Sequence, residues 1–490
     1  MYAIGVDIGT TTICALVFDC GGAGAVKAVT VPNDAYIEAR AFESLQDPQL
    51  IFEKVKNAID SLVAEYGPIV AIGLSCQMHG IVYVDADGNA ASPLYTWQDG
   101  RGDQAGTDGA GYAGELKRLT GCGGLATGYG AVTHFYNVMN GLVPREAAGF
   151  CSIGDYAAMR LTGKNRCASH QSNAASFGLF DLRAGRFDAG AIAKGGMDPA
   201  FFPAVERGCA VFGETAGGVP VSYCIGDNQA SYIGSVASPE ESVLINVGTG
   251  GQISVACGAA DGAGSGGASV KPAGPDGVRD GDGCDNITQA GSDISADLPA
   301  ALELRPLIGD RFIQVGAILC GGRAYAALEN FFAQVLDIAG AAPRGRLYEA
   351  MNRLAENEAN VAADPLAVST RFSGTRQSPD MRGGIYNLGL NNFTPAHFTA
   401  GVIAGIAEEF YELYGHMEGA GRRTLLVGSG NGLRKNRALQ KRLSERFGMP
   451  LLIPEHTEEA AFGAALYALA ACERYAGLAE AQAAIRYVEA

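Results

Sequence analysis

The chain has 490 residues, 48% of them hydrophobic and 18% charged, and its formal net charge is −16. This length exceeds one ordinary domain and allows two cores of about 240 residues each. The negative charge argues against binding to a nucleic-acid backbone or to an anionic membrane surface. Twelve scattered cysteines without C-x-x-C pairs indicate reduced thiols and a cytoplasmic location. No signal peptide or membrane-spanning segment is expected.

Two short runs of β-forming residues open the chain within Tyr2–Phe18, and the segment between them reads D-I-G-T-T-T. This pattern predicts a β-hairpin whose turn carries a carboxylate, a glycine and three hydroxyls. Gly9 allows a ligand to approach the backbone closely, and successive N–H groups of such a turn can converge on an anion. Asp7 suits Mg2+, which prefers a few carboxylates together with water and phosphate oxygens.

The turn therefore has two interpretations. It binds the phosphates of a magnesium nucleotide, or it is an ordinary turn in which Asp7 and Thr10 satisfy local backbone groups. Under the first interpretation the candidate metal-binding residue is Asp7, and the candidate phosphate-binding residues are Gly9, Thr10, Thr11 and Thr12.

A buried strand is predicted at Ile69–Ser75, after an amphipathic helix at Leu50–Tyr66 that ends at Gly67-Pro68. This strand delivers the sequence C-Q-M-H-G at its carboxyl end, where open α/β sheets bind ligands. Gln77 and His79 offer neutral hydrogen-bonding groups that suit a polyhydroxylated substrate. A satisfied buried histidine is the other interpretation of His79.

The only tryptophan, Trp97, lies in the sequence L-Y-T-W-Q-D-G-R, close to Asp99 and Arg101. An apolar ring beside a carboxylate and a guanidinium is suited to a sugar, because the ring contacts C–H groups while the charged groups bind hydroxyls. The alternative is a structural tryptophan next to an Asp–Arg ion pair.

The segment Val221–Ser235 has the pattern strand, Gly-Asp, helix, and it places Asp227 where the strand gives way to the helix. Aspartate is a favoured helix N-cap, which is one interpretation of this residue. A helix N-terminus also keeps a carboxylate ionised and fixed in place, as a general base requires. Asp227 is therefore the candidate catalytic base.

Near the middle of the chain, Ser242–Val255 repeats the strand, glycine–threonine turn and strand of the first residues. An internal repeat at half the chain length predicts two similar halves whose turns face a shared cleft. The glycine-rich stretch 258–285 has no periodicity and predicts a mobile surface loop. The candidate nucleotide contacts of this half are Gly248, Thr249 and Gly250 in the turn, Gly321 and Gly322 before a predicted helix, and Gly428, Ser429, Gly430 and Asn431 after a predicted strand.

Together these motifs resemble the FGGY carbohydrate kinases, which belong to the superfamily of actin, hexokinase and the heat-shock ATPases, and the resemblance extends over nearly the whole chain. It implies an α/β fold of two duplicated ribonuclease-H-like domains around an interdomain cleft. Residues 1–237 would carry the sugar site and the base, and residues 238–490 the adenosine site. The segments Q-M-H-G and W-Q-D-G-R are most similar to those of the sedoheptulokinases.

The resemblance also implies roles for single residues. Asp227 would be the general base that takes the proton of the sugar hydroxyl. The sugar site would be lined by Gln77, Met78 and His79, and by Asp99 with Trp97 and Arg101 beside it.

By this resemblance the chain is an ATP-dependent kinase that uses Mg2+ and phosphorylates a primary hydroxyl of a ketose. Sedoheptulose, which would give sedoheptulose 7-phosphate, is the expected substrate. The alternatives are xylulose, another sugar of the family, or an inactive sugar-sensing member of the fold. A chaperone of the same scaffold would need a peptide-binding domain, for which we expect no room after the last motif. The expected partner is a small-molecule sugar, and the oligomeric state, monomer or homodimer, stays open.

Overall fold

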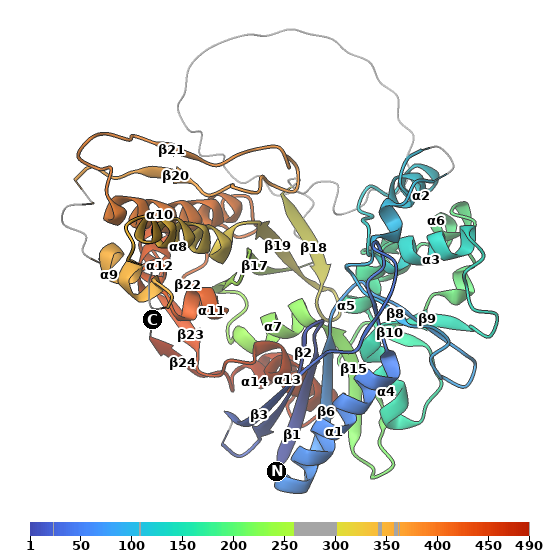
Figure 1. The fold of residues 1–490 in the computed structure, drawn as a ribbon. Helices are drawn as coiled ribbons and strands as arrows, with labels where there is room; N and C mark the ends of the chain where they lie inside the picture. Colours follow the sequence, from blue (N-terminus) through green and yellow to red (C-terminus); the bar gives the residue numbers. More distant parts are fainter. Residues whose placement is uncertain are drawn as a thin grey trace.

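The computed structural model describes residues 1–22, 24–106, 109–258, 301–341, 345–356, 361 and 363–489. These residues form two α/β lobes, each built around one mixed sheet (Figure 1). The first lobe extends from β1 (Tyr2–Ile8) to α7 (Asp227–Ser235), and the second from β16 (Ser242–Val247) to β24 (Tyr487–Glu489). Apart from Gly258, the glycine-rich stretch 258–285 lies outside the described residues, so the prediction of a mobile loop there stays a prediction.

The sheet of the first lobe has six strands in the order β14-β15-β6-β1-β2-β3. β1 and β2 form the predicted antiparallel hairpin, β6 runs parallel to β1, and β15 runs parallel to β6. The strands beside β1 are β2 (Thr12–Asp19), β3 (Gly24–Pro32), β6 (Ile69–Cys76), β14 (Val211–Glu214) and β15 (Pro220–Gly226).

The sheet of the second lobe repeats this arrangement, in the order β18-β19-β17-β16-β22-β23-β24. β16 and β17 form the second hairpin, β22 runs parallel to β16, and β23 runs parallel to β22. The duplication predicted from the repeated turn is thus present in strand order and direction, with β18 added at one edge. The bounds are β17 (Gly251–Gly258), β18 (Leu302–Pro306), β19 (Arg311–Ile318), β22 (Leu425–Ser429) and β23 (Leu451–Pro454).

Helices cover both faces of each sheet, and short strands complete the lobes (Figure 1). The remaining helices of the first lobe are α1 (Pro48–Tyr66), α2 (Tyr112–Thr120), α3 (Gly130–Met139), α4 (Ile153–Thr162), α5 (Gln171–Ala174) and α6 (Ala189–Lys194). Those of the second are α8 (Gly321–Ile338), α9 (Tyr348–Glu356), α10 (Pro395–Tyr414), α11 (Asn431–Arg434), α12 (Arg437–Phe447), α13 (Glu459–Ala471) and α14 (Leu478–Gln482). The short strands are β4 (Tyr36–Ile37), β5 (Leu45–Gln46), β7 (Val82–Val84), β8 (Leu94–Tyr95), β9 (Gly149–Cys151), β10 (Ala168–His170), β11 (Phe180–Asp181), β12 (Arg186–Phe187), β13 (Ala204–Glu206), β20 (Ala367–Ser369) and β21 (Gly384–Tyr386).

The strands β1 and β6 share one alternation of large and small residues, A-I-G-V-D in β1 and A-I-G-L-S in β6, and these segments pair in register. The large residues of both strands, such as Ile4 and Val6, enter the core that includes residues of α1 and α4. The opposite face carries alanine and glycine and ends in Asp7 and Ser75, because successive side chains of a strand point to opposite faces. The alternation therefore carries Asp7 to the face between the lobes.

Helix α13 of the second lobe packs on this small-residue face and against α7, so that both helices lie between the two sheets (Figure 1). A methyl group added at Gly5 or Gly73 would overlap a main-chain oxygen of α13. Gly234 of α7 and Gly463 of α13 each approach the backbone of the other helix in the same way. The two lobes are joined by backbone contacts that only glycine permits.

We expect Gly463→Ala to destabilise the protein by about 1–3 kcal/mol, because its methyl group would overlap the main-chain oxygen of Ala230 in a fully packed contact. Gly124→Ala is the matched control, since its added methyl group meets open space, and its effect should stay below about 1 kcal/mol. Urea unfolding followed by circular dichroism measures both. Equal unfolding midpoints for the two variants would contradict the proposed contact.

Candidate active site between the two lobes

The turn between β1 and β2 is held by hydrogen bonds to its own carbonyl oxygens. The N–H of Gly9 donates to the carbonyl of Thr12 at 2.9 Å, and Asn33 Nδ2 donates to the carbonyl of Gly9 at 2.8 Å. Within the described residues, the N–H groups of Thr10 and Thr11 have no acceptor in this hydrogen-bond network. Two adjacent free N–H groups in a tight turn can bind an anion such as a phosphate.

Two of the predicted sugar-site residues contact this turn. The Thr10 hydroxyl donates to Gln77 Oε1 at 3.1 Å and accepts from Trp97 Nε1 at 2.9 Å. Gln77 is buried, and its Nε2 donates to Gln46 Oε1 at 3.1 Å, so both ends of its amide are occupied. Trp97 remains 47% exposed, which leaves part of its ring open to a ligand. Gln77 therefore positions the first turn, and Trp97 connects the turn to the predicted sugar site.

His79 follows the carboxyl end of β6 with a left-handed backbone, φ 75°, that turns its ring onto Tyr129. The rings stack with centroids 4.4 Å apart, and His79 Nδ1 lies 2.7 Å from the carbonyl oxygen of Ser176. Burial lowers the pKa of His79 to about 4, so the ring is neutral. Since a carbonyl oxygen only accepts, Nδ1 carries the proton and Nε2 is left as an acceptor. Met78, also buried, packs directly against Gly226.

Asp99 and Arg101 form a buried ion pair. Arg101 Nε lies 2.5 Å from Asp99 Oδ1, and the N–H of Ser44 donates to Asp99 Oδ2 at 3.1 Å. The guanidinium also donates to Asn137 Oδ1 at 2.6 Å and lies 4.2 Å from the centre of the Tyr95 ring. Neither Asp99, 0% exposed, nor Arg101, 2% exposed, has a surface open to a ligand. This geometry matches the alternative interpretation of the motif, a structural ion pair.

Asp227 lies at the first residue of α7, directly after β15. The N-cap position is Gly226, so the interpretation of Asp227 as an N-cap is wrong. Its Oδ1 accepts from the N–H of Asn228 at 2.7 Å, and Asn228 Nδ2 donates to Gln252 Oε1 of β17 at 2.8 Å. Burial and, after it, the charge of Asp7 raise the pKa of Asp227 to about 7. A carboxylate with this pKa, tied to the second hairpin, is suited to accept a proton.

The carboxylate of Asp7 is under the influence of a second negative charge, that of Glu458 from the other lobe. Its Oδ1 accepts from the Ser75 hydroxyl at 2.7 Å. Burial raises the pKa of Asp7 to about 6, the Ser75 hydrogen bond lowers it, and the charge of Glu458 raises it again. A divalent cation would relieve this repulsion between carboxylates. Among the described residues, no group of three or more His, Cys, Asp or Glu side chains could hold a metal ion by itself, and Mg2+ usually keeps water and phosphate oxygens as ligands.

In the second lobe, the turn Gly248, Thr249 and Gly250 packs against the start of α8. The N–H of Gly322 donates to the carbonyl of Gly248 at 2.9 Å, and the next N–H donates to the carbonyl of Thr249 at 2.9 Å. A side chain at Gly321 would meet the carbonyl oxygen of Gly250. The N–H groups at the start of α8 therefore hold the second turn, while the N–H of Thr249 has no acceptor within the described network.

The predicted adenosine segment lies beside the same turn. Asn246 Nδ2 donates to the Ser429 hydroxyl at 2.8 Å. Gly430 has a φ of 80° and lies so close to the carbonyl of Val247 that a side chain there would meet it at 2.6 Å. Gly428 and Ser429 are the last two residues of β22, and Asn431 begins α11. All three glycine segments predicted in the second half are thus brought together by the strands β16 and β22.

Several residues of this region were not selected from the sequence. Glu303 and Arg305 alternate along β18, and Glu303 also pairs with Arg376. Tyr129 stacks on His79 and comes from the segment T-G-Y-G. A strand reading L-E-L-R-P places both charged residues on one face, but only the tertiary structure shows which surface that face meets.

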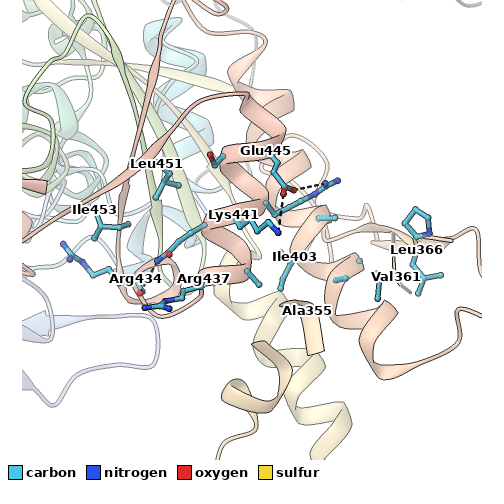
Figure 2. Close-up of a pocket in the computed structure, with 18 of the residues that line it drawn as sticks. Ala355, Val361, Leu366, Ile403, Arg434, Arg437, Lys441, Glu445, Leu451 and Ile453 are labelled. Carbon is cyan, nitrogen blue, oxygen red and sulfur yellow. Dashed lines mark hydrogen bonds and ion pairs between the residues drawn. The ribbon is translucent and has the colours of Figure 1, made fainter. Parts of the chain in front are cut away.

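A large cavity of about 1270 Å³ lies on the second lobe, between α10, α12 and the edge of the sheet (Figure 2). Its lining includes Ile403, Arg437, Lys441 and Leu451. None of the predicted site residues lines it, so we place the candidate active site at the paired turns instead.

Within the described part of the chain, we find no helix whose length and hydrophobicity would let it span a membrane.

Comparison with known proteins shows the class of protein to which this chain belongs. The model of the N-terminal domain of the FGGY carbohydrate kinases matches residues 2–234, and that of the C-terminal domain matches residues 301–472. The chain therefore belongs to the FGGY family of carbohydrate kinases, which are ATP-dependent sugar kinases, and the resemblance seen in the sequence is confirmed.

Particular relatives cover almost all of the chain. The sedoheptulokinase of Mus musculus is 24% identical over 95% of this chain and 97% of its own length, and that of Homo sapiens is 23% identical with the same coverage. The crystal structure of xylulose kinase from Rhodospirillum rubrum is 19% identical and matches 100% of this chain and 93% of its own, with a TM-score of 0.78. The predicted two-domain α/β fold of this superfamily is thereby confirmed.

We expect Asp227→Asn to raise the melting temperature of the free protein near about pH 8, and to raise it progressively less as the pH falls toward about 4. The pKa of Asp227 rises on folding from 3.8 to about 7. The stability contributed by its protonated form is therefore present at low pH and is lost as the pH rises through about 7. A neutral asparagine avoids this loss.

Thermal unfolding of both proteins over this pH range measures the effect. Asp87→Asn is the control, because Asp87 lies exposed in a surface turn. A melting-temperature difference between wild type and Asp227→Asn that does not change with pH would contradict the raised pKa.

Proposed function

We propose that the protein transfers the γ-phosphoryl group of ATP to a primary hydroxyl of a ketose, and that sedoheptulose is the substrate. The observation that carries this proposal is the position of Asp227, which follows β15 at the same end of the sheet as Asp7 of β1. Its neighbour Asn228 bonds both Asp227 and Gln252 of the second hairpin. The choice of sugar is supported by the sedoheptulokinases of mouse and human, which match this chain over 95% of its length.

The two lobes would bind different substrates. Residues 1–237 would carry the acceptor site and the base, and residues 238–490 the adenosine. The free N–H groups of the two turns would bind the phosphates, with Gly9, Thr10, Thr11 and Thr12 on one side and Gly248, Thr249 and Gly250 on the other. The adenosine would lie against Gly428, Ser429, Gly430 and Asn431, and Gly321 and Gly322 would support the second turn.

Asp227 would act as the general base. Its carboxylate takes the proton of the attacking hydroxyl, the hydroxyl oxygen bonds to the γ-phosphorus, and the bond to the bridging oxygen of ADP breaks, so that ADP leaves with that electron pair. Most of the rate enhancement in such a transfer comes from positioning and charge stabilisation. The hydrogen bond from Asn228 fixes one carboxylate oxygen, and the other is left for the hydroxyl.

Asp7 would hold Mg2+ through water, near Asp227 and Glu458, whose charges it would balance. When bound, this ion supplies positive charge that neutralises the phosphates. The described residues fit such a site, because Asp7 and Ser75 pair one residue before the ends of β1 and β6, on the face between the lobes.

The acceptor would lie beside His79 and Trp97. Nε2 of the neutral His79 would accept a hydrogen bond from a sugar hydroxyl, and the exposed ring of Trp97 would contact C–H groups. Met78 would shape the pocket next to the base, and Gln77 would hold the first turn. Asp99 and Arg101 would not contact the sugar; their ion pair would keep the Trp97 segment in place. The cytoplasmic location that we expect from the scattered cysteines stays a prediction.

Over a panel of sedoheptulose, xylulose, ribulose, gluconate and glycerol, we expect the highest kcat/KM with sedoheptulose. The longer ketose offers more hydroxyl groups for hydrogen bonds than the five-carbon sugars do. A coupled assay of ADP release measures turnover, and phosphorus NMR identifies the phosphorylated carbon. Preference for xylulose would favour the alternative substrate, for which the xylulose kinase structure is a relative of the same fold. Indifference to sedoheptulose would end its assignment.

We expect Asp227→Asn to lower kcat by about 100- to 10,000-fold, the usual contribution of a general base, and to leave sugar binding nearly unchanged. Asparagine keeps an oxygen for the Asn228 N–H but cannot take a proton. Steady-state kinetics and calorimetric sugar binding provide the two readouts, with Asp87→Asn as control. Full turnover in the Asp227→Asn protein would place the base elsewhere. Sugar binding by a wild type without turnover would instead favour a sugar sensor.

A further inference from the structure

The edge strand β18 connects the second lobe to the acceptor side of the first lobe. Gln229 Nε2 of α7 donates to the carbonyl of Pro306 at 3.0 Å, and Gln171 Nε2 of α5 donates to the carbonyl of Gly309 at 2.9 Å. In Figure 1 one end of β18 lies beside α5, and the two elements are in contact. The side chains of β18 on this side therefore face the region that contains the predicted sugar site.

Arg305 of β18 is held in a fixed orientation by a neighbouring carboxylate. Its Nε and Nη2 donate to Glu303 Oε2 at 3.1 and 2.6 Å. The other oxygen of Glu303 pairs with Arg376, so Glu303 is shared by two arginines. Because both bonds use one edge of the Arg305 guanidinium, Nη1 has no partner in the hydrogen-bond network of the described residues. The side chain of Arg305 is 15% exposed, so its guanidinium lies in a largely enclosed space.

The groups around Arg305 identify this space. Burial is the main cause of the pKa shifts of Asp227 and His79, and the charge of Arg305 acts to lower both pKa values. Burial lowers the pKa of Arg305 itself, while Tyr129 and Asp227 raise it. Gln229, whose amide bonds the carbonyl of Pro306, lies against Gly226, the residue before the base. The end of β18 that follows Arg305 is therefore close to Asp227. These groups come from the first lobe, whereas Arg305 comes from the second.

We propose that Nη1 of Arg305 donates a hydrogen bond to a hydroxyl of the sugar acceptor, next to the hydroxyl that is phosphorylated. This inference rests on the proposed function and adds a specificity-determining residue to it. A fixed guanidinium with one free edge suits a polyol, because hydrogen bonds from a charged donor are stronger than those from a neutral one. Since the residue belongs to the second lobe, sugar binding would require both lobes and would stabilise their approach.

A different role for Arg305 would be to stabilise the phosphoryl group in transit. The two roles have different kinetic consequences. A contact with the sugar affects sugar binding and leaves the slow hydrolysis of ATP by water unchanged. A contact with the phosphoryl group lowers phosphate transfer to water as well as to sugar. Gln171 of α5 holds the carbonyl of Gly309 just after β18, and Ser176, which follows α5, bonds His79. This position of β18 beside the proposed sugar site favours a contact with the sugar.

We expect Arg305→Met to raise the KM for the sugar by about 10- to 100-fold, the effect of losing one charge-assisted hydrogen bond. The KM for ATP and the ATP hydrolysis without sugar should change by less than about twofold, because neither depends on the sugar contact. Arg305→Lys should recover part of the loss. Arg446→Met is the matched control, since Arg446 of α12 makes a similar two-bond pair with Glu408 of α10.

Thermal unfolding of each variant shows whether it folds, and Glu303→Gln, which loosens Arg305 without removing it, gives a second route to the same loss. An unchanged sugar KM in Arg305→Met would overturn the inference, and so would an equal fall in turnover and in sugar-free ATP hydrolysis. If the wild type phosphorylates no sugar, the proposed function fails. Calorimetric binding of sedoheptulose to wild type and Arg305→Met then decides on Arg305, and equal or absent binding in both overturns its role.

Discussion

The structure depends on one close contact, in which α13 of the second lobe lies on β1 and β6 of the first and against α7. Glycines at Gly5, Gly73, Gly234 and Gly463 bring backbone against backbone, and a single methyl group at any of these positions would overlap a main-chain oxygen. Close-packed interiors tolerate such additions poorly. Because α7 begins with Asp227, this contact also places the candidate base between the lobes.

The same contact explains why carboxylates gather at one place. The strand alternation that points small residues at α13 also points Asp7 and Ser75 toward it, and Glu458 arrives just before α13 begins. Enclosure raises the pKa values of Asp7 and Asp227, which costs stability in the absence of a cation. A site of this kind exchanges stability for a base that can accept a proton near neutral pH.

Hydrogen bonds between segments far apart in the sequence hold the turns of the site in place. Thr10 is held by Gln77 and Trp97, from two segments that follow the hairpin at some distance. Asn228 connects the base to the second hairpin, and the start of α8 holds the second turn. Each of the two turns that we propose to bind phosphate is thus supported by residues that are not part of it, which gives its free N–H groups a fixed direction.

The sequence by itself determined the repeated hairpins, the amphipathic helix α1, the buried strand β6 and the position of Asp227 at a strand–helix junction, because these follow from local periodicity and turn chemistry. The pairing of the lobes, the burial of Asp99 with Arg101 and the place of Arg305 were decided by the tertiary structure alone. They depend on which surfaces meet across long separations in the chain: a buried ion pair and a sugar contact have the same local sequence, and only packing distinguishes them.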